Sequence, residues 1–196
     1  NFYATATQGQ FNGGTKGAGL TARVDQDNLF GTGLKSVAWL QYAQGSTSLN
    51  ANFGHLDWGQ DSKNWRIVES VNWQKGAFGG QAIVLFASEK DNTGLKTNSA
   101  SVGGRMSYAI TKNFKMVGEL GYSQYKVDDG SDTAHLTKLT IAPTLSTGPD
   151  FWNRPELRLY ATFAKWNKAA GNVTGQTAFD DKTSGNSFGA QIEWWF

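Results

Sequence analysis

The stretch Phe188-Gly-Ala-Gln-Ile-Glu-Trp-Trp-Phe196 decides the fold prediction. Successive side chains of a strand point to opposite faces, so this stretch has two faces of different character. One face carries uncharged and mostly large side chains, at Phe188, Ala190, Ile192, Trp194 and Phe196. The other carries small or polar side chains and one indole, at Gly189, Gln191, Glu193 and Trp195. Such an apolar face favours aggregation in water but suits the lipid-facing band of a membrane barrel. The stretch therefore predicts the closing strand of a transmembrane β-barrel.

Composition supports an all-β fold and excludes several classes of site. The 196 residues form one predicted domain, 1–196, and the absence of cysteine excludes disulfides and thiolate metal sites. Two histidines, His55 and His135, are too few for a histidine metal site, and a net charge of +2 predicts no nucleic-acid partner. Charged residues at 17% and 24 glycines favour strands and turns. Mean hydropathy is −0.46 and no apolar run of about 18 residues occurs, so we expect no membrane helix.

Strand-like runs recur along the chain between clusters of Gly, Asn, Asp and Ser. We predict ten antiparallel strands, at about 2–9, 15–25, 34–45, 64–73, 77–89, 99–110, 114–126, 136–146, 154–166 and 186–196. Short connections are predicted at 30–33, 74–76 and 111–113, and long ones at 46–63, 88–98, 127–135 and 167–185. Short turns at one end and long loops at the other are typical of outer-membrane barrels.

Several strands separate an apolar face from a charged one. In 154–166, Leu157, Leu159 and Phe163 alternate with polar and charged residues. A soluble sandwich also alternates, but repeated charges on the second face favour a water-filled lumen. We expect the lumen to contain Arg105, Glu119, Lys138, Glu156, Arg158 and Glu193. Mixed donors and acceptors match the hydroxyl groups of a sugar. The alternative is a solvated lumen wall whose charges pair with one another and bind no specific ligand.

Two tryptophans interrupt the polar face. Trp195 shares the parity of Glu193, and Trp152 shares the parity of Arg158. An aromatic ring can stack on the C–H face of a pyranose while polar neighbours bond its hydroxyls. The alternative is that both indoles anchor the barrel at the interface or pack the lumen. Trp166 has the same parity but is expected at the rim, and Trp39 is a further candidate.

Catalytic motifs are absent from the sequence, so we predict a protein that is not an enzyme and needs no cofactor. No Ser/His/Asp ordering, HExxH, GxSxG or P-loop occurs. Two alternatives stay open beside a sugar channel: a general porin without sugar selectivity, and an outer-membrane barrel hydrolase that uses loop aspartates and a histidine.

The C-terminal third also resembles a known family. Residues 138–167, KLTIAPTLSTGPDFWNRPELRLYATFAKWN, and residues 188–196 are similar to the C-terminal end of the maltoporin-type sugar porins, which include sucrose and β-glucoside porins. Weaker similarity extends through residues 119–122, 102–105 and 40–43. The resemblance implies a homotrimeric channel in the bacterial outer membrane through which mono- or oligosaccharides diffuse passively.

The resemblance also implies roles for particular residues. Trp152 and Trp195 match two aromatics of the family's sugar-stacking row, and Leu20 stands where a third aromatic is expected. Arg105, Glu119, Lys138, Arg158 and Glu193 would bond the sugar's hydroxyls. The aromatic residue Phe196 would also mark the strand for the outer-membrane assembly machinery.

The expected strand number raises a closure problem. The family's barrel has eighteen strands, whereas ten strands would leave little room for a sugar. An open sheet would expose two long edges to lipid. The sequence also begins without Met or a signal peptide, so we expect a mature product or a fragment. The closure problem and the resemblance together predict the C-terminal portion of an eighteen-strand barrel. A self-closed small barrel is the alternative.

Overall fold

The structure is a computed structural model that describes residues 16–49, 59, 61–173 and 181–195. Its strands are β1 (Gly17–Gln26), β2 (Lys35–Gly45), β3 (Lys63–Lys75), β4 (Phe78–Lys90), β5 (Lys96–Ala109), β6 (Phe114–Val127), β7 (Ala134–Ser146), β8 (Glu156–Trp166) and β9 (Ser184–Glu193). A 3-10 segment, η1 (Leu29–Gly31), follows β1, and a short helix, α1 (Lys168–Val173), follows β8.

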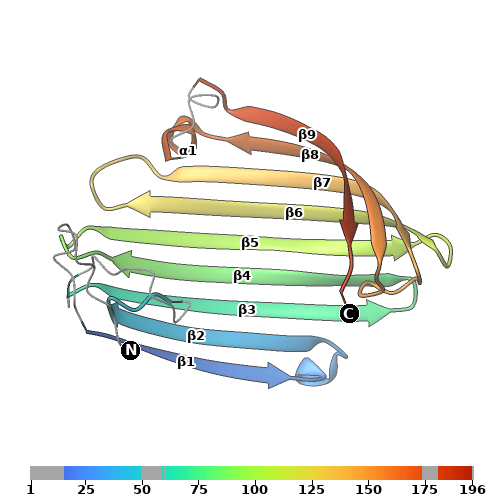
Figure 1. The fold of residues 1–196 in the computed structure, drawn as a ribbon, viewed down its shortest axis with the longest axis horizontal. Coiled ribbons are helices and arrows are strands. Elements are labelled where there is room, and N and C mark those ends of the chain that lie inside the picture. Colours follow the sequence, from blue (N-terminus) through green and yellow to red (C-terminus); the bar gives the residue numbers. More distant parts are fainter. Residues whose placement is uncertain (1–15, 50–58, 60, 174–180, 196) are drawn as a thin grey trace, which may run out of the picture.

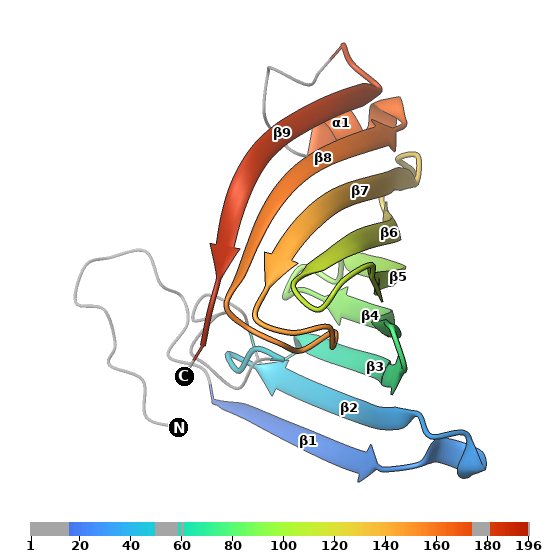
Figure 2. The ribbon, with the colours of Figure 1, turned by 90° about the vertical axis from the view of Figure 1, so that its right-hand side faces the viewer.

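The described strands form one antiparallel sheet in sequential order from β1 to β9 (Figure 1). The sheet curls about its strands, with β1 and β9 at its two edges (Figure 2). These two strands are not paired with each other, so the described residues form an incomplete barrel wall. The predicted all-β antiparallel fold is confirmed. Nine of the ten predicted strands match β1 to β9, and the first, at 2–9, lies outside the described residues.

The convex outer face of the sheet is apolar. The strand register brings outward side chains of neighbouring strands side by side, as in the row of Leu120, Leu139 and Phe163. Each described strand contributes at least one exposed large apolar side chain, among them Leu20, Leu40, Ile67, Phe86, Val102, Leu120, Ile141, Leu159 and Phe188. A continuous apolar band on one side of a sheet matches the lipid-facing surface of a membrane barrel.

One carboxylate interrupts the apolar outer face. Glu69 pairs with Ala38 and Val84 and is the acidic residue that the described strands place on this side. Its Oε1 accepts a hydrogen bond from Ser36 Oγ on β2. The pairing supplies one donor to a group that would otherwise be costly to place against hydrocarbon.

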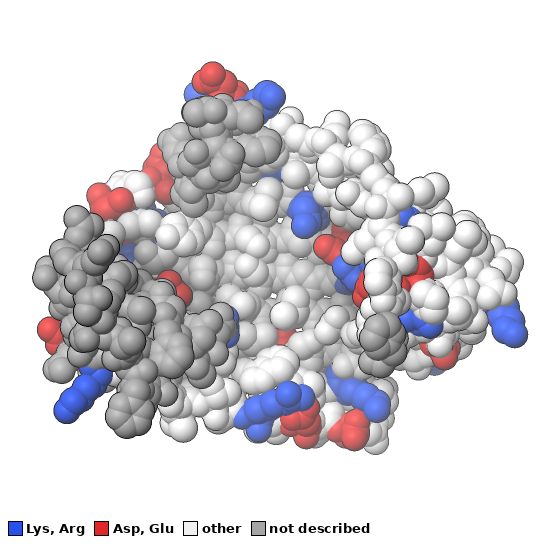
Figure 3. Space-filling model, viewed as in Figure 1, with Lys and Arg blue, Asp and Glu red and all other residues white. Residues whose placement is uncertain are grey.

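The concave face is hollowed and polar. Figure 3 looks into this face and shows charged side chains gathered toward the right-hand end of the strands. At that end lie the connections 27–34, 76–77, 110–113 and 147–155, which we call the turn side. The opposite end carries 46–49, 61–62, 91–95, 128–133, 167–173 and 181–183, which we call the loop side.

The loop predicted at 88–98 is wrong in extent, because the β4–β5 ladder continues to the pair Lys90 and Lys96. Its polar residues are typical of a loop but pair as strand. Residues 91–95 make the turn, in which Asp91 Oδ1 accepts hydrogen bonds from the Thr93 and Leu95 backbone amides, each at 2.9 Å. The Thr93 hydroxyl, which also donates to this carboxylate, holds the pKa of Asp91 below its ordinary value.

Strand β8 begins two residues later than predicted. Arg154 was expected to start it, but the ladder begins at Glu156, which pairs with Ser146 and Glu193. Pro155 has no N–H to donate to a ladder, so the strand starts after it. Arg154 consequently belongs to the 147–155 turn.

The face assignment can be tested with one charge placed on either side of the sheet. Leu120→Arg puts a guanidinium in the middle of the outer band, and we expect it to lower the free energy of unfolding by about 2–4 kcal/mol. Gly121→Arg is the matched control, because the Gly121 position faces the lumen with open space around it. Denaturant unfolding of the assembled protein in lipid vesicles, followed by tryptophan fluorescence, gives both values. Equal losses would contradict the assignment.

Candidate functional site

The two predicted stacking residues meet on the turn side of the concave face. Trp152 lies in the 147–155 turn and Trp195 follows β9, and their ring centroids are 6.3 Å apart with an angle of 52° between the planes. Both indoles are accessible, with 45% of Trp152 and 51% of Trp195 exposed. Two residues separated by 43 positions in sequence thus form one aromatic surface.

Trp152 is positioned by its neighbour Phe151. Phe151 is 4% exposed and contacts Trp152 edge-on, with ring centroids 4.9 Å apart. The backbone N–H of Phe151 donates to Gln74 Oε1 of β3 at 2.8 Å. A Cβ on Gly79 of β4 would lie 2.7 Å from Phe151 Cβ, so only glycine allows this close approach. The 147–155 turn is therefore anchored across the sheet on β3 and β4 (Figure 2).

Trp195 is positioned by Arg154. The Arg154 guanidinium carbon lies 4.4 Å from the centroid of the Trp195 ring, a cation–π contact. The same guanidinium donates to the carbonyls of Phe151 and Asn153, each at 2.9 Å. One arginine thus joins the turn that carries Trp152 to the end of the strand that carries Trp195.

A buried charge network lies behind the aromatic pair. Glu156 Oε1 accepts from Lys115 Nζ at 2.5 Å and from Arg154 Nη1 at 2.9 Å, and its Oε2 pairs with Arg158. Glu193 accepts from Arg154 at 3.1 Å and from Arg158 at 2.5 Å. Three cations therefore share two carboxylates. Lys115 also donates to the Asp150 carbonyl at 2.7 Å, which ties the turn to β6.

A small polar pocket lies next to this network. Its volume is about 170 Å³, and it is formed by Arg105, Val117, Glu119, Thr140, Ala142, Arg158, Tyr160, Thr162 and Gln191. Arg105 donates to Glu119 Oε2 from both Nε and Nη2 at 2.9 Å. Sites that enclose a small molecule usually measure about 300–1,000 Å³, so this pocket contacts part of a solute and does not enclose it.

The structure brings four of the five predicted polar residues together. Arg105, Glu119 and Arg158 line the polar pocket, and Glu193 joins Arg158 in the charge network. Lys138 lies on the same face but two residues along β7 from Thr140, and it is exposed. Lys115 and Arg154 were not chosen from the sequence as site residues, although the alternating parity of 114–126 places Lys115 on the lumen face.

The structure also decides on which face of the sheet two further candidate positions, Leu20 and Trp39, lie. Leu20 stands where the family resemblance implies a third stacking aromatic, and its register with Tyr42 places it on the outer face, where it is 72% exposed. Trp39 lies on the lumen side of β2, with the Arg23 guanidinium 5.3 Å from its ring. Successive residues of a strand point to opposite faces, so the strand register determines the face of each side chain.

The described residues contain no cluster of three or more His, Cys, Asp or Glu side chains that could hold a metal ion. The same residues include no helix that is both long and apolar enough to cross a membrane.

The curled sheet, its apolar outer band and its hydrophilic concave face define the wall of a membrane porin. The sequence profile of the LamB porin family matches residues 1–196, so the chain belongs to this family, whose members reside in the bacterial outer membrane. It is 31% identical over 191 residues to Maltoporin 2 of Yersinia pestis, and equally so to that of Yersinia pseudotuberculosis. It is 30% identical over 194 residues to Maltoporin 1 of Klebsiella pneumoniae.

These alignments cover 90% of this chain and 43% of each Yersinia protein, and 91% and 44% for the Klebsiella protein. The chain therefore spans less than half the length of the relatives that it matches.

The charge network should be more important for stability than an exposed ion pair. Glu156→Gln leaves Lys115, Arg154 and Arg158 without their shared buried carboxylate, and we expect a loss of about 3–5 kcal/mol in the free energy of unfolding. The control is Asp25→Asn, which removes the carboxylate of the exposed Arg23–Asp25 pair and should change stability little. Denaturant unfolding measures both, and a Glu156→Gln loss no larger than that of the control would refute the structural role of the network.

Proposed function

We propose that this chain forms part of the wall of an outer-membrane channel through which sugars diffuse passively. The observation that supports it best is the exposed Trp152–Trp195 surface beside the polar pocket. An aromatic surface binds the C–H face of a pyranose, and polar groups at its edge bond the hydroxyls. Both kinds of contact lie here on one lumen face.

The polar residues have different parts in this proposal. Arg105, Glu119 and Arg158 present donors and acceptors in the pocket to sugar hydroxyls. Glu193 orients Arg158 and retains partial exposure of its side chain, 25%, toward the lumen. Lys138 supplies an exposed donor further along β7. Such separate and weak contacts suit transport, because a solute that binds too tightly would not leave.

The sheet must be completed by further strands. Unpaired backbone groups along β1 and β9 would be very costly in hydrocarbon, so a membrane sheet has to close on itself. We propose that additional strands close the wall into the eighteen-strand barrel of the family and that three such barrels associate. The apolar outer face would then contact lipid or a neighbouring subunit.

Removing either indole should weaken sugar binding. Trp152→Ala and Trp195→Ala each lose one stacking surface, and we expect the sugar concentration that half-blocks the ion current to rise roughly 2- to 10-fold. The measurement is the single-channel conductance of the assembled protein in planar bilayers with maltose, sucrose or a β-glucoside.

Trp65→Ala is the matched control, because Trp65 is an exposed indole, 41% accessible, on the outer face. Unchanged block in both lumen variants would refute the stacking role. A wild-type channel that no sugar blocks would be a general porin.

The terminal aromatic residue is proposed to serve assembly. Strand addition at an exposed edge would let the outer-membrane assembly machinery bind an alternating strand that ends in Phe196. Deleting Phe196 should reduce the amount of channel inserted in cells while leaving the conductance of each inserted channel unchanged. Quantifying the protein in outer-membrane fractions beside single-channel conductance separates the two effects, and normal insertion would contradict this role.

A further inference from the structure

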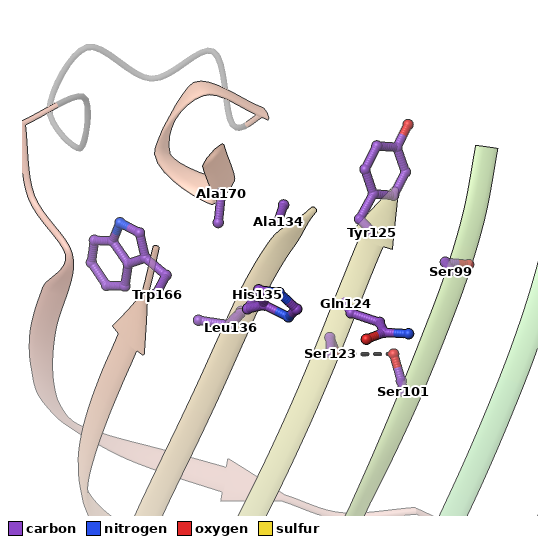
Figure 4. Close-up of a pocket in the computed structure, with 10 residues that line it drawn as sticks. All are labelled: Ser99, Ser101, Ser123, Gln124, Tyr125, Ala134, His135, Leu136, Trp166 and Ala170. Carbon is purple, nitrogen blue, oxygen red and sulfur yellow. Dashed lines mark hydrogen bonds between the residues drawn. The ribbon is translucent and has the colours of Figure 1, made fainter. Parts of the chain in front are cut away.

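A second and larger pocket lies on the same concave face, at the loop side. Its volume is about 450 Å³, within the usual range of small-molecule sites. Its lining comes from β5 to β8 and from α1, and includes Ser101, Ser123, Leu136, Trp166 and Ala170 (Figure 4). None of these residues belongs to the turn-side site.

The strand register arranges part of this lining as a rung across four strands. Trp166 pairs with Leu136, Leu136 with Ser123, and Ser123 with Ser101. Neighbouring strands lie about 4.8 Å apart, so the rung extends roughly 14 Å from an indole to two hydroxyls. Ser101 Oγ donates to Ser123 Oγ at 2.9 Å, which keeps both hydroxyls on the lumen face (Figure 4). The Trp166–Leu136 end of the rung is apolar, and the other end carries the hydroxyls of Ser123 and Ser101.

The apolar end of this rung is held in place from two directions. A Cβ on Gly185 of β9 would lie 3.1 Å from Trp166 Cη2, so the glycine leaves room for the ring. The Trp166 backbone N–H donates to the Thr183 carbonyl at 2.8 Å. The indole is therefore supported by β9 while it borders the pocket.

Helix α1 borders the pocket through Ala170, and Asn167 fixes the start of the helix to β7. Asn167 Oδ1 accepts from the backbone N–H of His135 at 3.0 Å and from that of Ala170 at 3.1 Å. Its Nδ2 donates to the Thr133 carbonyl at 2.7 Å. Ala170 is thereby held at the pocket with a side chain too small to fill it.

One rung of the sheet separates this pocket from the polar pocket on the turn side. The next rung holds Gly103, Gly121 and Lys138, and a Cβ on Gly121 would meet no atom within 4 Å. The rung after that holds Arg105 and Glu119 of the polar pocket. Two rungs span about 13 Å along a strand, so consecutive rings of an oligosaccharide could contact both pockets.

We infer that the loop-side pocket is a pyranose-binding subsite that receives sugars before they reach Trp152 and Trp195. The C–H face of one ring lies on Trp166 and Leu136, and its hydroxyls bond Ser123 and Ser101. This inference rests on the proposed sugar channel. It adds a second binding site at the loop side and the order in which an entering sugar contacts the two sites. A site at one mouth accelerates capture from that side and contributes less to solutes that arrive from the other.

The test measures sugar capture from each side separately. Maltose is added to one side of a bilayer containing the assembled channel, and current fluctuations give its association rate. We expect Trp166→Ala to lower the rate from the loop side about threefold or more, with a smaller change from the turn side. Trp166→Phe retains an aromatic face and should restore most of the rate. Asn92→Cys, in a chain without cysteine, identifies the loop side through block by a bulky thiol reagent.

Each outcome decides between the two proposals. Equal rates in wild type and Trp166→Ala from both sides, or equal losses from both sides, would overturn the subsite and leave the sugar channel standing. A wild-type channel that neither maltose, sucrose nor a β-glucoside blocks from either side would overturn both. Should Trp166→Ala fail to assemble, Leu136→Ser probes the same rung from β7, and Trp65→Ala on the outer face is the control for loss of an indole.

Discussion

The requirement that every backbone N–H and C=O in hydrocarbon be hydrogen-bonded determines the rest of this structure. It demands continuous ladders, which the register from β1 to β9 provides over strands of ten to fourteen residues. The ladders fix an alternation with a period of two, so each strand contributes separately to a lipid-facing surface and to a lumen. Parity therefore allows Ile141 to contact an apolar environment and its neighbour Thr140 to line a polar pocket.

The strands and their faces could be predicted from the sequence because both depend on local alternation. The C-terminal strand shows this best, since Phe188 and Ile192 are exposed outward while Gln191 and Glu193 belong to the lumen side. Local composition failed where it was ambiguous. Residues 88–98 are polar enough for a loop, but pairing between Lys90 and Lys96 extends both strands. Register overrides composition when cross-strand bonds are available.

The site could be predicted only in part. The alternation along a strand shows which face of the sheet a side chain lies on, but not how far along the lumen it lies or which residues it contacts. Trp152 and Trp195 could be chosen as lumen aromatics, but nothing local indicates that a turn folds inward to place them together. The anchors of that turn, Gln74, Gly79 and Lys115, belong to strands far away in sequence. Leu20, which the family resemblance matches to a sugar-stacking aromatic, instead lies on the outer face by its register with Tyr42. A single strand carries too little information to fix such a register.

The inward anchoring of the 147–155 turn has a consequence for the order of assembly. Every strand pair among the described residues joins neighbours in sequence, so the sheet can grow by adding one hairpin after another. The bond between Phe151 and Gln74 instead joins residues 77 positions apart, and such distant contacts form only after the intervening chain is organised. Four strands, β4 to β7, must therefore be in place before Trp152 is docked. The scaffold forms first, and its aromatic surface is completed as a late event of maturation.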